Sequence, residues 1–398
     1  MHLVARRAAE FGVEIDGTVR FNLRRAVQRK DTIVQGILDG IYRGLQGREA
    51  ITFLRGQARF LNDHEVDTGD RRLSFARAII ATGARNAVPP IQGLADVDYL
   101  TNRSALQLHE LPNHLMVVGG GYVGIEFAQM YARFGSRVTL LGRNRQLAPG
   151  EEPELAQLLA EYLQEEGVDV HTDAPVLRVR QEGNEKVVTA RIEGQERDFR
   201  GDALLIATGR VGNTDGLHLD AAGVTRDAKT GFISVDEQLR TSQPHIWAIG
   251  DVKGGWMFTH VATYDGPIAA LNAVKELGRT VDYRVVPRAI FSSPTLAAVG
   301  LTEEEARTQG YEVKVGSVPA VGGRATAMGD TRGRLKAIVK ADDGQILGFH
   351  ILAPHGDDLL HEAVAAMYDH GTIDRIARSI HVHPTLSELV KAAARAAR

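Results

Sequence analysis

Apolar residues recur at helical spacing over the first 45 residues, which predicts a helical segment there. From residue 50 to residue 80 the pattern changes to short apolar runs between turn residues, which predicts a small antiparallel sheet. Its strands are expected at 58–60, 65–67 and 78–80, and Pro89-Pro90 closes this unit.

A strand, a glycine-rich turn, a helix and a second strand follow between Leu115 and Leu141. This is about the 30-residue length of a βαβ unit, so the pattern predicts an α/β fold. Further elements are expected as a helix at 154–166, a strand at 203–207, a helix at 260–277, strands after residue 285, and two final helices near 357–370 and 385–397.

Composition narrows the choice of partners and location. The formal net charge is −3, with acidic and basic residues mixed along the chain, so no cationic field for nucleic acid is expected. Arg6, Arg7 and Glu10 interrupt the apolar residues at the start, which does not fit a secretory signal. The longest apolar stretch, near residues 115–125, is far short of the roughly 20 residues that span a bilayer. We therefore expect a cytoplasmic protein with no membrane partner.

The chain contains no cysteine, which excludes disulfides, thiolate metal sites and a thiol nucleophile in this sequence. Its histidines do not form HExxH or another clear ligand spacing, and no metal site is expected. The histidines considered are His350, His355, His361 and His370.

The strongest local motif is a glycine-rich turn that follows an apolar strand and opens a helix. Gly119 permits a tight turn, Gly121 lets a pyrophosphate approach the backbone, and Gly124 allows the helix to pack closely on the strand. The motif in this setting predicts dinucleotide binding. The alternative is a glycine-rich turn without a ligand.

The end of the second strand indicates which nucleotide is bound. Gly142 stands where an acidic residue would bind the ribose 2′-hydroxyl of NAD, and Arg143 and Arg145 follow it. Two guanidinium groups could pair with a 2′-phosphate, so NADPH is favoured over NADH. Alternatively, the two arginines are solvated surface charges.

Three further motifs are weak alone. Two strands end in the same Ala-Thr-Gly tripeptide, at Gly83 and Gly209, and a third strand ends at Gly250-Asp251. Each one, taken separately, is typical of a simple turn.

Together with the C-terminal segment His383-Pro384-Thr385 and Glu388, these motifs in this order resemble the pyridine nucleotide-disulfide oxidoreductase family. That family includes lipoamide dehydrogenase, glutathione reductase, mercuric reductase and the soluble transhydrogenase. The segments 142–145 and 330–336 look most like mercuric reductases and the copper- or hypochlorite-response reductases, whereas the His-Pro-Thr motif is more like lipoamide dehydrogenase.

The resemblance implies an α/β fold with two dinucleotide-binding (Rossmann-like) domains, an incomplete FAD domain among them, and a C-terminal α+β dimerisation domain. It implies a homodimer that uses FAD and NADPH. The expected domains are 1–110 (FAD-binding, first part), 111–240 (NAD(P)-binding), 241–283 (FAD-binding, return segment) and 284–398 (interface).

The resemblance also implies roles for single residues. Tyr122 would be the lid that swings aside when the nicotinamide stacks on the flavin, and Glu126 would lie beside that ring. Asp251 would accept a hydrogen bond from the FAD ribityl chain. Alternatively, Tyr122 is a half-buried aromatic residue with no such role.

Two helix starts complete the expected site. The segment Phe258-Thr259-His260 begins a helix whose positive end could face the flavin and stabilise its reduced form. His383 would be the acid–base group in the partner subunit's site, with Glu388 orienting its imidazole and Pro384 at the first helical position. The alternative is a proline-initiated helix with an incidental histidine.

Members of the family begin with a strand, a first glycine motif and a Cys-x4-Cys segment, which this sequence does not contain. We expect a start assigned too late, with the redox cysteines upstream. The implied reaction passes hydride from NADPH to FAD and on to a disulfide or to a metal ion such as Hg(II) or Cu(II). The alternatives are a non-catalytic NADPH-binding fragment and a cysteine-free, transhydrogenase-like flavoprotein.

Overall fold

The computed structural model describes residues 7–398, and the chain folds into two compact units. The first unit contains the described residues up to Val27, Val88–Thr208 and Arg284–Arg398. The second unit contains Gln28–Ala87 and Gly209–Tyr283. Each unit is therefore built from segments that lie far apart in the sequence.

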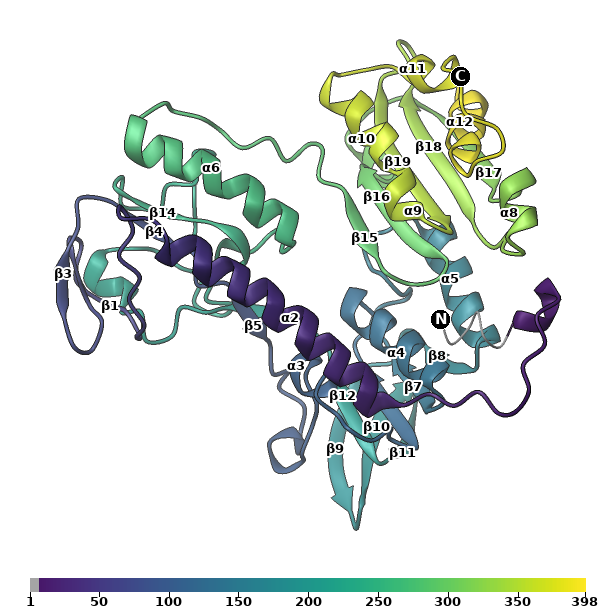
Figure 1. The fold of residues 1–398 in the computed structure, drawn as a ribbon, viewed down its shortest axis with the longest axis horizontal. Coiled ribbons are helices and arrows are strands. Elements are labelled where there is room, and N and C mark those ends of the chain that lie inside the picture. The colour runs from purple at the N-terminus through teal and green to yellow at the C-terminus, as the bar shows by residue number, and fades with distance from the viewer. Residues whose placement is uncertain (1–6) are drawn as a thin grey trace. The chain divides into compact units, whose positions relative to one another are not determined.

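The first unit contains a four-stranded parallel sheet in the order β12-β6-β7-β8, of which Figure 1 labels β12, β7 and β8. The predicted βαβ unit is confirmed as β6, α4 and β7. The elements of this region are β6 (His114–Val118), α4 (Tyr122–Phe134), β7 (Arg137–Leu141), α5 (Pro153–Glu165), β8 (Val168–His171) and β12 (Ala203–Ile206), with the short helices η2 (Leu94–Asp96) and α3 (Asn102–Ala105) before them.

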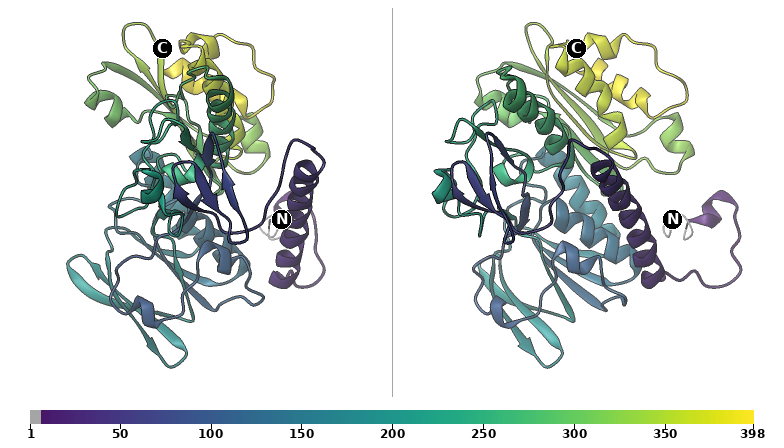
Figure 2. Two further views of the ribbon diagram at one scale, coloured as in Figure 1. Left: turned by 90° about the vertical axis from the view of Figure 1, so that its left-hand side faces the viewer. Right: turned by 60° about the vertical axis from the view of Figure 1, so that its left-hand side comes forward.

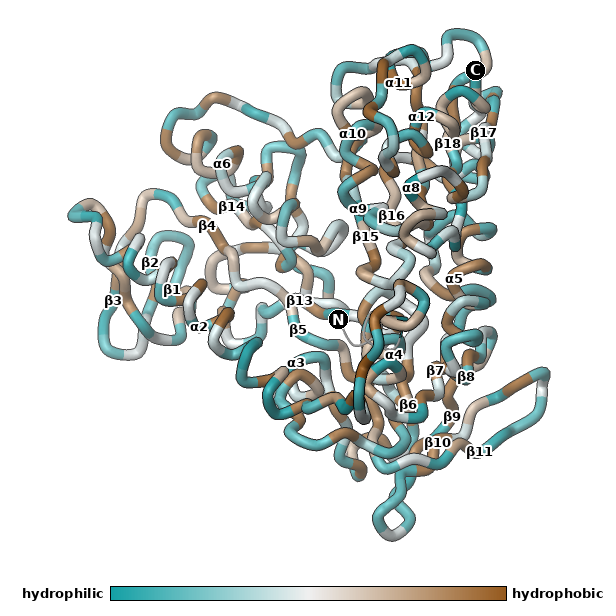
Figure 3. The backbone as a smooth tube through the Cα atoms, turned by 45° about the vertical axis from the view of Figure 1, so that its right-hand side comes forward, coloured by the Kyte–Doolittle hydropathy of each residue, from teal (hydrophilic) through white to brown (hydrophobic). Residues whose placement is uncertain are grey.

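Both faces of this sheet are covered, as is usual for parallel strands. Leu115 and Val117 belong to a buried cluster with Ile125 of α4 and Leu159 of α5. Teal and brown residues alternate along α5 in Figure 3, as expected for a helix with one apolar face. The opposite side chains of β6 join a cluster with the antiparallel sheet β9 (Val176–Glu182), β10 (Glu185–Ile192) and β11 (Gln195–Gly201).

The C-terminal part of the first unit is a five-stranded antiparallel sheet in the order β15-β16-β19-β18-β17. Figure 2 shows helices α10 and α12 (yellow) against the strands (green), and α12 contacts β17 and β18. The elements are β15 (Arg288–Ile290), β16 (Thr295–Gly300), α7 (Glu303–Thr308), β17 (Val313–Pro319), α8 (Gly323–Ala327), β18 (Arg334–Lys340), β19 (Ile346–Ala353), α9 (Gly356–Leu359), α10 (His361–Tyr368), α11 (Asp374–Ala377) and α12 (Ser387–Ala396).

The start of α12 corrects one prediction. The helix begins at Ser387, so Pro384 does not occupy its first position. The Thr385 hydroxyl donates to the Val382 carbonyl at 2.7 Å, and the Thr385 N–H donates to Glu388 at 3.1 Å. These local hydrogen bonds form a turn before the helix. They engage the hydroxyl and the N–H of Thr385 with nearby groups, which favours a turn over a helix that begins at Pro384.

The second unit combines three small sheets with helix α6 (Thr259–Lys275) and the part of α2 (Leu23–Gln46) from Gln28 onward. Strand β4 pairs in parallel with β14 and not with the neighbouring hairpin, so the prediction that 78–80 joins the antiparallel sheet is wrong. The elements are β1 (Arg59–Asn62), β2 (Glu65–Asp67), β3 (Arg72–Ser74), β4 (Ala78–Ile80), β5 (Ala84–Asn86), β13 (Arg210–Gly212), η3 (Leu219–Ala222), β14 (Ile246–Ala248), η4 (Gly250–Lys253) and α6 (Thr259–Lys275).

The N-terminal segment is helical only in part. Figure 1 shows α2 (Leu23–Gln46) as one long helix, and a single turn, η1 (Ala8–Phe11), precedes it. Residues 12–22 are not helical, which corrects the prediction, because Gly12 and Gly17 adopt positive φ angles of 75° and 101°. The part of the predicted helix at 1–6 lies outside the described residues. No helix within residues 7–398 has the length and apolar character needed to cross a bilayer.

Candidate functional site

The glycine turn between β6 and α4 is sterically fixed and open at one position. Gly119 has φ +129°, and a β-carbon there would overlap the Ala207 carbonyl. A β-carbon at Gly124 would overlap the Gly119 carbonyl. At Gly121, in contrast, a β-carbon would meet no atom within 4 Å. The turn therefore needs glycine at Gly119 and Gly124 for its shape, and it leaves Gly121 exposed to an approaching ligand.

The beginning of α4 is suited to an anion. Gly121 is the residue before the helix, and no side chain caps it. The first backbone N–H groups of a helix have no partner inside the helix, and they carry the positive end of its dipole. A phosphate placed at the open Gly121 position would accept hydrogen bonds from these groups.

Gly142 brings the end of β7 against the same turn. A β-carbon at Gly120 would lie 3.3 Å from Gly142 Cα and 3.0 Å from the Leu147 side chain. The Gly142 N–H donates to His171 at 2.8 Å, and the Gly142 carbonyl accepts the Ala174 N–H at 2.8 Å. The strand end is therefore held in place with no carboxylate at this position.

Arg143 and Arg145 lie directly after Gly142, and both are exposed. Neither guanidinium makes a hydrogen bond or an ion pair with any residue in 7–398. Both side chains can therefore turn toward a ligand at low energetic cost.

Tyr122, the first residue of α4, is tied to the C-terminal sheet through a buried ion pair. Its hydroxyl donates to Glu151 Oε1, which also accepts Arg288 Nε at 2.7 Å. Burial and the charge of Glu151 raise the pKa of the Tyr122 hydroxyl, so the phenol stays protonated and donates. Sequence reasoning missed Glu151 and Arg288.

The rest of α4 is fastened to the connection between β15 and β16. Glu126 accepts the Phe291 N–H at 2.9 Å, and Gln129 exchanges two hydrogen bonds with the backbone of Ser293 at 2.8 and 3.0 Å. Burial raises the pKa of the Glu126 carboxyl, and the Phe291 N–H partly offsets this effect. One face of α4 is thus fixed by the segment that joins β15 and β16 of the C-terminal sheet.

A second buried ion pair lies next to the first. Lys336 Nζ of β18 contacts Glu152 Oε2 at 2.8 Å and Glu303 Oε2 at 2.9 Å, and the Glu303 N–H donates to Glu152 at 2.6 Å. Burial disfavours the charged ammonium, but the bonds to the two carboxylates outweigh it and raise the pKa of Lys336. The consecutive acids Glu151 and Glu152 therefore each hold one cation of the C-terminal sheet.

In the second unit, the strands that follow the two Ala-Thr-Gly tripeptides pair with each other. β5 and β13 are antiparallel, and the Ala87 N–H donates to Gly209 at 2.9 Å. The Asn213 N–H donates to the Gly83 carbonyl at 2.9 Å. The structure thus brings Gly83 and Gly209 to the two ends of one small ribbon.

Asp251 lies beside this ribbon. Asp251 Oδ2 accepts a hydrogen bond from Arg210 Nη2 at 3.1 Å, and the same nitrogen donates to the Ala84 carbonyl at 2.8 Å. The other carboxylate oxygen of Asp251 makes no hydrogen bond within the described chain. Arg210, which sequence reasoning missed, therefore orients Asp251 and leaves one oxygen available.

The loop that carries Asp251 is held by a fully buried acid. Asp265 of α6 accepts the Gly250 N–H at 3.0 Å and the Tyr283 hydroxyl at 2.6 Å, and it pairs with Lys253 at 3.5 Å. Burial raises the pKa of the Tyr283 hydroxyl, and its bond to Asp265 raises it further. Asp265 is the one acidic residue of α6, and it stands four residues after the apolar Val261 and three before Ile268, which was a signal in the sequence that could have revealed this anchor.

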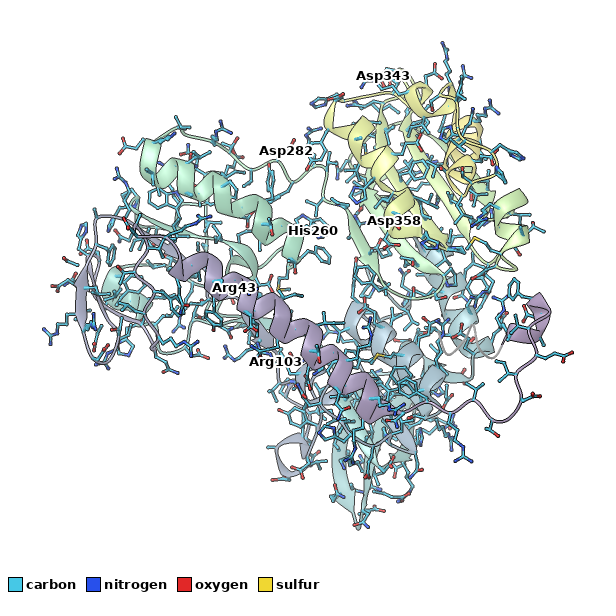
Figure 4. The ribbon with its side chains drawn as sticks, in the orientation of Figure 1. Arg43, Arg103, His260, Asp282, Asp343 and Asp358 are labelled. Atoms are coloured by element: carbon cyan, nitrogen blue, oxygen red, sulfur yellow. The ribbon has the colours of Figure 1, made fainter. Side chains whose placement is uncertain are left out.

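The start of α6 carries the three residues predicted there. Phe258 precedes the helix without a side-chain cap, and its ring stacks on His260 with centroids 5.2 Å apart. Thr259 and His260 are exposed, and Figure 4 labels His260 at the end of α6 where the helix begins. The start of α6 is therefore another helix end that carries the positive end of the dipole.

The structure also brings His383 and Glu388 together. His383 Nδ1 lies 3.1 Å from Glu388 Oε1, and Glu388 also accepts the Thr385 N–H. The Thr385 N–H, followed by the bond to His383, lowers the pKa of Glu388 below its usual value. The glutamate is thus ionised and fixes which ring nitrogen of His383 faces outward.

One group outside these motifs has metal-ligating side chains. Asp63, His64 and His245 have potential ligand atoms within 4.8 Å of one another among the described residues. The two imidazole rings are stacked, with centroids 4.4 Å apart and planes inclined by 16°. Stacked rings do not direct their in-plane lone pairs to one point, so we assign no metal to this group.

The predicted residues fall into both units. Gly119, Gly121, Gly124, Gly142, Arg143, Arg145, Tyr122, Glu126, His383 and Glu388 belong to the first, and Gly83, Gly209, Asp251, Phe258, Thr259 and His260 belong to the second.

Comparison with known proteins identifies the family. Residues 6–266 match the model of the pyridine nucleotide-disulphide oxidoreductase family, and residues 286–394 match that family's dimerisation domain. The chain is 36% identical over 375 residues to a mercuric reductase of Staphylococcus aureus, covering 94% of this chain and 68% of the relative. It is 35% identical over 398 residues to a dihydrolipoyl dehydrogenase of Geobacillus stearothermophilus, covering 99% of this chain and 84% of the relative. For a mercuric reductase of Bacillus cereus, the match spans 59% of the relative's length.

Solved structures agree. The HOCl-induced flavoprotein disulfide reductase RclA from Escherichia coli superposes with a TM-score of 0.88 at 34% identity, covering 95% of this chain and 87% of that chain. LpdA from Mycobacterium tuberculosis gives a TM-score of 0.88 at 25% identity, covering 99% and 86%. The chain therefore belongs to the pyridine nucleotide-disulphide oxidoreductase family of FAD-dependent enzymes, with an α/β dinucleotide-binding architecture followed by the dimerisation domain.

Proposed function

We propose that this protein binds NADPH at the glycine turn and passes its hydride to FAD and onward to a disulfide or a metal ion. The observation that carries the proposal is the open Gly121 position on a turn that packs against Gly142, which is followed by Arg143 and Arg145, whose guanidinium groups have no partner within residues 7–398. The pyrophosphate would lie on the N–H groups of α4, and the 2′-phosphate would pair with the arginines. Because residue 142 is a glycine, no carboxylate stands at this position to repel the phosphate.

The residues of the second unit fit FAD. Asp251 has one oxygen held by Arg210 and one available for a ribityl hydroxyl. The start of α6 would face the flavin with the positive end of its helix dipole. When bound, FAD supplies the two-electron chemistry that side chains cannot perform. The protein's part is to hold the cofactor and to set the local charge.

The remaining residues would act on the ligands directly. Tyr122 would cover the nicotinamide side of the site and move when the ring enters, and Glu126 would lie beside the ring. His383, oriented by Glu388, would hold or release a proton at the acceptor site of the partner subunit. With these roles we propose the domain layout 1–110 and 241–283 for FAD, 111–240 for NADPH and 284–398 for the interface.

A homodimer is part of the proposal. Ile380 and Val382, which flank His381 next to the His383 motif, are 98% and 75% exposed. Apolar side chains this exposed beside a proposed acid–base residue fit a surface that a second copy covers. The expected mass in solution is that of two chains.

The test begins with the purified protein. A yellow protein with a flavin absorption band supports the enzyme, whereas a colourless protein that binds NADPH and cannot be reconstituted with FAD supports the non-catalytic alternative. Flavin-dependent exchange between two nicotinamide nucleotides, without turnover of disulfide, Hg(II) or Cu(II), supports the transhydrogenase-like alternative. Failure to bind either nicotinamide nucleotide would refute the proposal.

Nucleotide choice is tested with Arg143→Ala/Arg145→Ala. Since a hydrogen bond to a charged group contributes about 1.5–3 kcal/mol, the double variant should bind NADPH at least about tenfold more weakly. Its affinity for NADH should change little. Arg191→Ala, an exposed arginine on β10, is the matched control and should change neither affinity.

A further inference from the structure

We propose that Glu151, held by Arg288, is a positioning residue that latches Tyr122 beside the nucleotide turn. Binding of the nicotinamide half of the nucleotide then competes with the hydrogen bond between Tyr122 and Glu151. This inference rests on the proposed function, because it concerns how the same turn admits its ligand.

Three separate elements meet at the latch. Tyr122 is the first residue of α4, Glu151 precedes α5, and Arg288 lies on β15. Both the Tyr122 hydroxyl and Arg288 Nε donate to the same carboxylate oxygen, Glu151 Oε1. A second nitrogen of the same guanidinium, Arg288 Nη1, donates to the Gly300 carbonyl at 3.3 Å, which also fixes the position of Arg288. The position of the tyrosine is therefore set by the C-terminal sheet.

Burial makes this hydrogen bond strong. The side chains of Glu151 and Arg288 are 3% and 6% exposed. Glu151 Oε2 is buried and has no hydrogen-bond partner among the described residues. A buried carboxylate with so few donors holds each of them tightly, because water cannot replace a donor that leaves. The Tyr122 hydroxyl thus adds to the stabilisation that the Arg288 guanidinium gives this charge.

The latch lies next to the open part of the turn. Tyr122 follows Gly121 directly and is half-buried, and the space at Gly121 is open. The adenine half of the nucleotide would lie toward Gly142 and the two arginines. Only the nicotinamide half would have to displace the ring. Displacement removes one donor from Glu151, and this loss subtracts from the affinity for the intact nucleotide.

The test compares two ligands on one conservative variant. Tyr122→Phe keeps the ring and removes the hydroxyl. We expect it to bind NADPH about tenfold more tightly than the wild type, while 2′-phospho-ADP-ribose, which lacks only the nicotinamide, binds unchanged. The melting temperature should fall at the same time, because Glu151 loses a donor. A purely structural role predicts the loss of stability with no gain in affinity.

Two further variants complete the design. Glu151→Gln in the Tyr122→Phe background should add no further affinity for NADPH, since the latch is already open. Glu152→Gln disturbs the neighbouring buried pair with Lys336, and it should lower stability without changing either affinity.

The possible failures can be told apart. If the wild type binds neither ligand, the proposed function and the latch are both overturned. If the wild type binds both ligands, and Tyr122→Phe leaves NADPH affinity unchanged or weakens it, only the latch is overturned.

Discussion

Gly124 packs so closely against Gly119 that a β-carbon on Gly124 would overlap the Gly119 carbonyl oxygen. This approach lets α4 begin directly over the end of β6. The same turn leaves open space at Gly121. One glycine is therefore needed for the fold and the other for access to the backbone.

The two positions should respond differently to alanine. Gly121→Ala has room for the methyl group and a φ of −89°, so the melting temperature should stay within about 2 °C of the wild type. NADPH affinity should fall at least about tenfold, since the methyl group occupies the path of the phosphate. Gly124→Ala should instead lower the melting temperature, because the turn must shift to relieve the overlap. Thermal unfolding and nucleotide titration of both variants provide the check; equal effects at the two sites would contradict the separation.

Asp265 should be essential for the Asp251 loop. In Asp265→Asn, the buried Lys253 loses its counter-charge, and an uncompensated buried charge costs about 3–5 kcal/mol. The Gly250 N–H keeps an acceptor only if the amide turns its oxygen toward it. We expect a lower midpoint in denaturant unfolding and weaker binding of FAD. Glu237→Gln, an exposed acid in the same unit, is the control and should leave both quantities unchanged.

Local motifs were predictable, whereas the contacts that support them were not. The close contact between Gly124 and Gly119 lies within six residues, so its glycine pattern can be recognised in the sequence, whereas the Ala207 carbonyl that also requires glycine at Gly119 is distant along the chain. The ion-pair partner of Glu151 is Arg288, and the pattern of apolar and polar residues does not predict contacts between positions that far apart in the sequence. The prediction that residues 12–22 are helical is wrong for a local reason. Gly12 and Gly17 adopt positive φ angles, which interrupt a helix even where the apolar residues have helical spacing.

The pairing of Lys336 with two carboxylates should make it a large contributor to stability. Lys336→Met leaves Glu152 buried without its cation, which costs about 3–5 kcal/mol. Lys314→Met, on the exposed side of β17, should change stability by less than about 0.5 kcal/mol. Denaturant unfolding of both variants measures the difference. Similar values for the two variants would show that the buried pair does not stabilise the first unit.

Glu126 should make the stability of the first unit depend on pH in the direction opposite to an ordinary salt bridge. Burial raises the pKa of its carboxyl, so the folded state binds a proton more readily than the unfolded state does. The ionised Glu126 carboxylate therefore destabilises the folded state. This destabilisation is present in full when the pH is above the pKa of Glu126 in the folded protein, and it is lost when the pH falls below the pKa in the unfolded chain, which is near 4.3. Glu126→Gln keeps an oxygen that accepts the Phe291 N–H and removes the charge. We expect this variant to melt at a higher temperature than the wild type at pH 7, with the difference vanishing near pH 4. A variant that melts lower at pH 7, or a difference that persists unchanged at pH 4, would show that the Glu126 charge is stabilised rather than penalised at this position.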